Sequence, residues 1–138
     1  MNTQLFTNVI KVNAKADQAR QILVNPTRLL KWVPEINAVD QKDGAFSITR
    51  SKEALNQFEV MAVEATDAKI TYHSRQGRLA YDLIFELTES NGQLQIRETL
   101  FTDPTQTKLP LKLLAPIGKQ ALKVNLVNLG RVIETLTV

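Results

Sequence analysis

The stretch LAYDLIFELT, residues 79–88, is the part of the sequence that decides the fold. Its large apolar side chains alternate with a mostly polar set, the apolar positions being Leu79, Tyr81, Leu83, Phe85 and Leu87. A period of two is typical of a strand with one face against a core and the other toward water. The pattern predicts a long strand here, within an antiparallel sheet.

The same period of two continues on the N-terminal side, at residues 45–50 and 69–75. Pairs typical of tight turns separate these runs: Asp43-Gly44, Thr66-Asp67, Gln76-Gly77 and Asn91-Gly92. Asp-Gly and Asn-Gly are favoured in hairpins because both central residues must adopt positive φ. We therefore predict about six consecutive antiparallel strands between Ile36 and Phe101.

The chain before this meander predicts one strand and two short helices. Residues 5–12 form an apolar run typical of a strand. A helix follows, with Ala19, Ile22 and Leu23 on its buried face, and Asn25-Pro26 ends it because a residue before proline avoids the helical region. A second helical turn carries Leu29, Leu30 and Trp32, and ends at Pro34.

The C-terminal segment returns to helical spacing. Pro116 is expected in the first turn of a long helix, where its missing N–H is harmless. A stripe then follows at spacings of three and four: Gly118, Leu122, Leu126, Leu129, Ile133 and Leu136. The segment order predicts an α+β helix-grip fold, in which a curved antiparallel sheet wraps around the last helix. Such an arrangement often leaves an internal cavity that binds a ligand.

Length and composition suit a single domain over residues 1–138. The 138 residues are 43% hydrophobic and 22% charged, as in ordinary soluble proteins. Cysteine is absent, which excludes disulfides, thiol catalysis and zinc ribbons. No run approaches the roughly 20 apolar residues of a membrane span, and the start does not resemble a signal peptide. We therefore expect a cytoplasmic protein without stable membrane insertion.

The net charge of +3 is concentrated near the C-terminus. The basic side chains there are Lys108, Lys112, Lys119, Lys123 and Arg131, with Glu134 as the acidic one after Asp103. We expect a solvated helix face, with an acidic partner as the alternative. Ile117 and Val124 lie off the helical stripe and are interpreted as exposed apolar residues, or else as part of a dimer or partner contact. Nucleic-acid binding is not expected.

The sequence also resembles the START-like (SRPBCC, helix-grip) superfamily, and within it the polyketide cyclase/dehydrase and lipid-transport group. The residues that carry the resemblance are Val12-Asn13-Ala14, Ala19-Arg20-Gln21-Ile22-Leu23, Asn25-Pro26, Leu30-Lys31-Trp32-Val33-Pro34-Glu35-Ile36 and Asn125-Leu126-x-x-Leu129. The resemblance implies a pocket between sheet and helix for a lipid, a polyketide, an aromatic compound or a hormone-like ligand. Some members of the superfamily are enzymes, others carry ligands and others regulate partners.

Arg50 and Glu98 are the candidate polar groups of such a pocket. Arg50 continues the apolar phase of Phe46 and Ile48, and Glu98 lies within the phase of its apolar neighbours. If both point inward, they could anchor a ligand carboxylate, hydroxyl or carbonyl, with Glu98 as a possible general acid or base. The alternative places Arg50 in solvent at a strand end and moves Glu98 to the outer face through a bulge.

The remaining candidates are apolar or aromatic. The expected cavity wall consists of Tyr72, Tyr81, Leu83, Phe85, Leu122, Leu126 and Leu129. Both tyrosines suit a pocket or, equally, an ordinary core. Trp32 is expected to pack under the short helices, with a position at the cavity mouth as the alternative. His73, the single histidine, is expected outward and solvated, and no metal site or cofactor is expected.

The sequence supports three functional hypotheses. The first is a monomeric or homodimeric carrier of a small hydrophobic ligand. The second is a polyketide cyclase/dehydrase-like enzyme in which Glu98 or a tyrosine moves a proton. The third is a regulatory module that binds a protein partner. Motifs of hydrolases, kinases and dinucleotide-binding enzymes are absent from the sequence.

Overall fold

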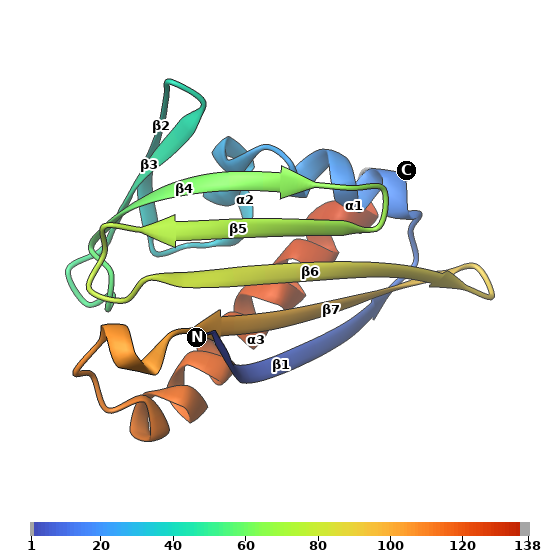
Figure 1. Cartoon of the computed structure of the whole chain (residues 1–138). Helices are drawn as coiled ribbons and strands as arrows, with labels where there is room; N and C mark the ends of the chain where they lie inside the picture. The colour runs from blue at the N-terminus through green and yellow to red at the C-terminus, as the bar shows by residue number, and fades with distance from the viewer. Residues whose placement is uncertain (1, 136–138) are drawn as a thin grey trace.

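A seven-stranded antiparallel sheet and a long C-terminal helix dominate the computed structural model, which describes residues 2–135 (Figure 1). The strands are β1 (Thr3–Val12), β2 (Ile36–Lys42), β3 (Ala45–Arg50), β4 (Phe58–Ala65), β5 (Lys69–Arg75), β6 (Tyr81–Ser90) and β7 (Gln93–Thr102). Their order in the sheet is β1-β7-β6-β5-β4-β3-β2, so β1 joins the far end of the meander beside β7.

The predicted six-strand meander is confirmed as β2 to β7. Its turns have the expected backbone, with positive φ at Asp43, Gly44, Asn91 and Gly92. The strand predicted at 79–88 begins two residues later, at Tyr81, because Leu79 belongs to the β5–β6 turn region.

Short helices connect β1 to the meander: α1 (Ala16–Leu23), the 3-10 helix η1 (Pro26–Arg28) and α2 (Leu29–Trp32). Val24 caps the C-terminal end of α1, and Asn25 caps the start of η1, where its side-chain oxygen accepts a hydrogen bond from the Thr27 N–H at 3.2 Å. Ala19, Ile22 and Leu23 are buried, as their spacing predicted.

The last helix, α3 (Leu111–Thr135), follows the 3-10 helix η2 (Pro104–Gln106) and begins earlier than expected. The prediction that Pro116 lies in the first turn is wrong, because Pro116 is inside the helix. Pro110 starts the helix instead, since its carbonyl accepts from the N–H groups of Leu113 and Leu114 at 3.0 Å. The stripe residue Leu136 lies outside the described residues.

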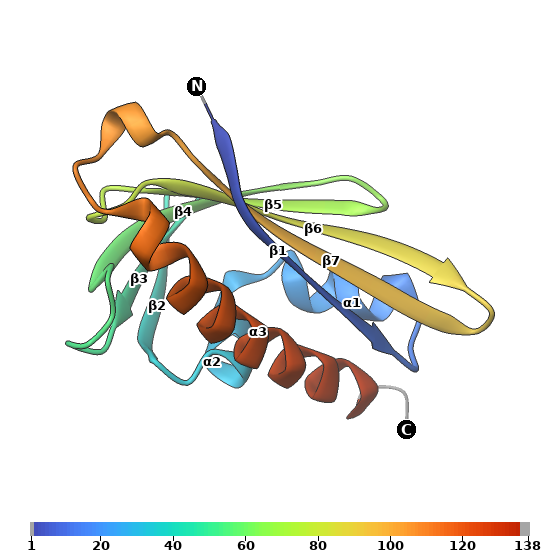
Figure 2. The same cartoon turned by 90° about the horizontal axis from the view of Figure 1, so that it is seen from below.

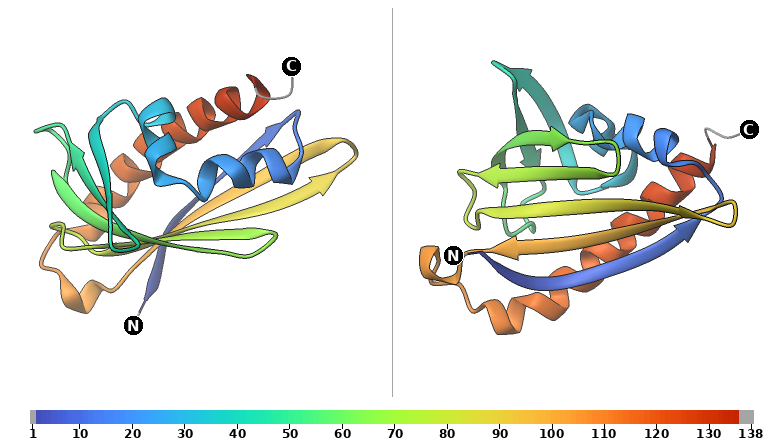
Figure 3. Two further views of the ribbon diagram at one scale, coloured as in Figure 1. Left: turned by 90° about the horizontal axis from the view of Figure 1, so that it is seen from above. Right: turned by 45° about the vertical axis from the view of Figure 1, so that its right-hand side comes forward.

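All three α-helices lie on the same side of the sheet (Figure 3). The long helix packs along β1, and two glycines allow the close approach. A Cβ at Gly118 would lie 3.3 Å from the Phe6 ring, and one at Gly130 would lie 2.8 Å from Cγ1 of Val12. These contacts hold α3 over the concave face of the sheet, which is the helix-grip arrangement.

Candidate ligand site on the concave face

The concave face of the sheet is apolar along most of its length and polar at one end. Alternation within the strands places Ile70, Phe85 and Ile96 on this face, all fully buried. The polar end lies where β3 ends and β6 begins, and carries Arg50 and Tyr81. A ligand with an apolar body and a polar group would match both parts of this surface.

The Arg50 guanidinium points inward and pairs with two carboxylates of this chain. Nη1 lies 2.8 Å from Oε1 of Glu35, and Nη2 lies 2.9 Å from Oε1 of Glu59. Burial alone would lower the pKa of Arg50, but the neighbouring Tyr81, Glu59 and Glu35 outweigh burial and raise it. The guanidinium is therefore a permanent cation whose charge the chain itself neutralises.

Glu59 is the functional candidate that the sequence reasoning missed. Its side chain is fully buried on β4, and it accepts hydrogen bonds from Arg50, from the Tyr81 hydroxyl at 3.0 Å and from Asn56 Nδ2 at 2.9 Å. The only signal in the sequence is that Glu59 shares the inward phase of Met61. The apolar residues of 58–65 lie in both phases, so that signal is weak.

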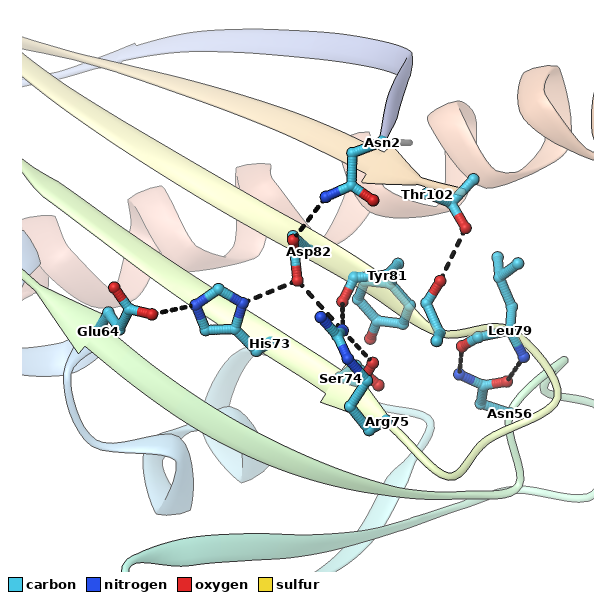
Figure 4. Close-up of polar contacts among 11 residues, drawn as sticks. Asn2, Asn56, Glu64, His73, Ser74, Arg75, Leu79, Tyr81, Asp82 and Thr102 are labelled. Carbon is cyan, nitrogen blue, oxygen red and sulfur yellow. Dashed lines mark hydrogen bonds and ion pairs between the residues drawn. The ribbon is translucent and has the colours of Figure 1, made fainter. Parts of the chain in front are cut away.

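Asn56 connects this cluster to the β5–β6 turn. It donates to the Leu79 carbonyl at 2.8 Å and accepts from the Leu79 N–H at 2.9 Å, as Figure 4 shows. A Cβ at Gly77 would lie 2.5 Å from the Asn56 side chain, so a larger residue there would displace the Asn56 amide. The polar end is thus a continuous hydrogen-bonded cluster, which we call the Arg50 cluster: Glu35, Arg50, Asn56, Glu59 and Tyr81.

The two tyrosines have different environments. Tyr81 as a residue is partly buried, and the pKa of its hydroxyl is raised by burial and by the Glu59 charge, with Arg50 opposing. Tyr72 is fully buried, and its hydroxyl donates to the Leu23 carbonyl at 2.6 Å. Tyr72 therefore ties β5 to the end of α1, while Tyr81 belongs to the Arg50 cluster.

Glu98 lies in the middle of the concave face, away from the Arg50 cluster. Its register with β6 is regular, so no bulge turns it outward, and it is fully buried. Oε1 accepts a 3.4 Å hydrogen bond from Asn8 Nδ2, whereas Oε2 is buried without a hydrogen-bond partner within residues 2–135. Burial raises the pKa of Glu98 to about 8, although Asn8 and Lys123 act in the opposite direction. At neutral pH the group is mostly a neutral carboxylic acid, which can donate a hydrogen bond.

A cleft of about 390 Å³ between β1 and α3 lies on the other side of Asn8. Asn8 lines this cleft together with Lys119 and Lys123, and it also donates to the Lys119 carbonyl at 3.0 Å. Asn8 is therefore the side chain that separates Glu98 from the surface.

The apolar candidates belong to one packed cluster. Phe85 makes edge-on contacts with Trp32 at 6.2 Å and with Tyr72 at 5.3 Å between ring centroids. Phe85, Leu126 and Leu129 have no exposed surface, and Leu83 is 5% exposed. The Trp32 ring is buried as expected, but its Nε1 has no hydrogen-bond partner in the described chain. In this conformation the interior is filled by side chains around Phe85.

The two halves of α3 cover the sheet unequally. In the second half, the inner residues Leu126, Leu129 and Ile133 are fully buried. In the first half, residues on the same face are only partly buried, and they include Leu111 and Leu122. We call this partly covered first half of α3 the open end.

His73 lies on the opposite, outer face, where it is only partly solvated. Its Nδ1 lies 2.8 Å from Asp82 and its Nε2 lies 2.6 Å from Glu64, as Figure 4 shows. Burial would raise the pKa of Asp82, but His73 and Arg75 lower it. Among residues 2–135, no group of three acidic or histidine side chains is placed to hold a metal ion.

Several solved structures share this architecture. A START superfamily protein from Mycobacterium smegmatis is 17% identical, with a TM-score of 0.77, and the match covers 97% of this chain and 99% of the other. The protein XoxI from Bacillus cereus is 13% identical, with a TM-score of 0.75 and coverage of 99% and 98%. A conserved protein from Geobacillus kaustophilus is 11% identical, with a TM-score of 0.71 and coverage of 98% and 96%.

These likenesses establish the START-like helix-grip fold, which the sequence motifs had implied. No protein-family model matches the sequence, and neither does any curated protein. Within the described chain, no helix is long and apolar enough to cross a bilayer.

Proposed function

We propose that this protein binds a small hydrophobic or amphipathic molecule between the concave face of the sheet and α3. The observation that carries the proposal is the buried Oε2 of Glu98, which has no hydrogen-bond partner within residues 2–135. A buried polar atom without a partner costs about 1–3 kcal/mol, so native proteins satisfy nearly all of them. A ligand hydroxyl or carbonyl beside Glu98 would supply the partner.

The chemistry of the site favours a ligand that is uncharged near Glu98. Because its pKa is about 8, Glu98 is mostly protonated at neutral pH and donates to an oxygen acceptor. Trp32 Nε1, on the ring that contacts Phe85, is a second donor without a partner in the described residues. A lipid, polyketide or aromatic compound bearing oxygen atoms has both the apolar surface and the acceptors.

Arg50 is better suited to holding the cluster together than to binding a ligand anion. Both terminal nitrogens already contact carboxylates, and a ligand carboxylate would meet the negative charges of Glu35 and Glu59. We assign Arg50 and Tyr81 to the polar end of the site, where a ligand hydroxyl could join the cluster. The open end of α3 gives the ligand its route to the interior.

A second candidate function is acid–base catalysis of the polyketide cyclase/dehydrase type. The observation in its favour is that Glu98 has a pKa of about 8 and so can both donate and accept a proton near neutral pH. Asn8, hydrogen-bonded to Glu98, would orient the carboxyl group. In this reading the interior would also fold the substrate around the Glu98 carboxyl.

Native mass spectrometry of the freshly purified protein tests the binding proposal. We expect a population heavier than the chain by the mass of one small organic molecule, which is released on denaturation. Glu98→Leu should lose this molecule, whereas Glu53→Leu, at an exposed carboxylate, should retain it. Preparations without the extra mass, together with no binding of uncharged apolar probes, would contradict the proposal.

A further inference from the structure

A second apolar surface lies on the outside of α3, where no other element covers it in Figure 2. It consists of four exposed side chains: Leu113 (71% exposed), Ile117 (68%), Val124 (51%) and Val127 (36%). Their separations of four, seven and three residues place them on one face of the helix. That face is opposite the buried stripe of Leu126, Leu129 and Ile133, so α3 is apolar on both sides.

The flank of this outer stripe is basic. Lys112 and Lys119 are exposed on α3, and Lys108 lies just before the helix. Residues 104–135 carry five basic side chains and one acidic side chain, whereas the rest of the chain has one more acidic than basic residue. The positive charge of the protein therefore gathers beside its exposed apolar stripe.

A second copy of this chain is a poor occupant of the stripe. Two α3 helices face to face would bring their lysines together without matching carboxylates along the stripe. Four side chains on one helix also fall short of the roughly 800 Å² per partner that stable protein interfaces bury. A surface that is negatively charged and accepts isolated apolar side chains fits better.

We propose that the outer face of α3 docks the protein on membranes rich in anionic phospholipids. Leu113, Ile117, Val124 and Val127 would enter the boundary between headgroups and acyl chains, with α3 lying parallel to the membrane. Lys108, Lys112 and Lys119 would contact the phosphate groups, each adding to the attraction. The docking does not depend on a ligand in the interior.

Vesicle flotation of the 138-residue chain tests this docking. We expect binding to vesicles of equal parts phosphatidylcholine and phosphatidylglycerol, and at least about tenfold weaker binding to phosphatidylcholine alone. Leu113→Gln/Ile117→Gln and, separately, Lys112→Gln/Lys119→Gln should each weaken binding about tenfold or more. High salt should release the wild-type protein.

Matched controls make the result specific to α3. Phe58→Gln, at an apolar residue that is 45% exposed on β4, should bind like the wild type. All variants change exposed side chains, so their thermal unfolding midpoints should match the wild type. Equal binding to both vesicle types, absence of binding, or binding unaffected by Leu113→Gln/Ile117→Gln would overturn the proposal. So would a concentration-dependent dimer that this double variant abolishes, because it would assign the stripe to a second copy.

Discussion

Glu98 is a buried acid whose chemistry differs from that of a free glutamic acid, because burial raises its pKa. The Glu98 carboxyl is fully buried and accepts only one long hydrogen bond, from Asn8, within the described residues. The anion is therefore costly, and the folded chain keeps the group as a neutral acid. This cost is typical of functional sites, where stability is given up for chemistry.

The raised pKa of Glu98 predicts that the folded state becomes less stable as the pH rises. The folded chain holds the Glu98 proton up to about pH 8, whereas the unfolded chain loses it near pH 4.5. Between these values the folded state binds more protons, so stability decreases as pH rises. Over the whole range the loss should be on the order of 5 kcal/mol, since each tenfold difference in proton affinity corresponds to about 1.4 kcal/mol.

Urea unfolding at pH 5 and pH 9 measures this dependence. Glu98→Gln should show less loss between the two pH values and should be more stable than the wild type at pH 9. An identical pH dependence in wild type and variant would show that Glu98 does not carry the effect.

The ion pair between Arg50 and Glu59 predicts that substitutions of the two residues have strongly coupled effects on the free energy of unfolding. Arg50→Leu or Glu59→Leu alone should cost about 3–5 kcal/mol, because each leaves a buried partner charge with less compensation. The double variant should cost clearly less than the sum of both. Urea unfolding of all four proteins gives the coupling free energy, and additive losses would contradict the ion-pair interpretation.

Whether a side chain points inward could be predicted from the sequence only where apolar and polar residues alternate clearly along the strand. Arg50 and Glu98 follow apolar neighbours at a period of two, so their inward position could be proposed from the sequence. Glu59 could not be found in this way, because both phases of β4 carry apolar residues. The pairing of Glu59 with Arg50 joins different strands, and residue order alone does not reveal such contacts.

At the scale of elements, α3 shows why local rules give helix boundaries poorly. Pro116 was expected at the helix start because proline lacks an N–H, but Pro110 provides that start. The helix continues through Pro116 and packs against β1. Helical spacing, in contrast, correctly predicted the buried residues Leu126, Leu129 and Ile133.

The contact between α3 and β1 predicts different effects at two glycines. Gly130→Ala places a Cβ 2.8 Å from Val12 and 3.2 Å from Ile10, and should cost about 1–3 kcal/mol through overpacking. Gly118→Ala meets only the Phe6 ring, at 3.3 Å, and a gain in helix propensity of about 1 kcal/mol offsets that contact. Thermal or urea unfolding of both variants checks the difference, and equal effects would contradict the packing described for α3.

At the scale of the whole molecule, the order of segments was enough to predict the helix-grip fold. The ligand site was harder to predict from the sequence. The side chains expected to line a cavity instead pack against one another around Phe85. Whether such an interior opens depends on how firmly α3 covers it. The partly buried inner residues Leu111 and Leu122 mark the half of α3 where opening is least costly.

Energy transfer from Trp32 tests the central claim, that the interior binds an apolar molecule, most directly. Trp32 is the only tryptophan of the chain, and its buried ring contacts Phe85. Titration with the uncharged probe N-phenyl-1-naphthylamine should give saturable energy transfer from Trp32 at one probe per chain. Leu113→Gln/Ile117→Gln should retain that signal, because those residues lie outside. Absent or non-saturable transfer, or its loss in this double variant, would contradict a ligand site in the interior.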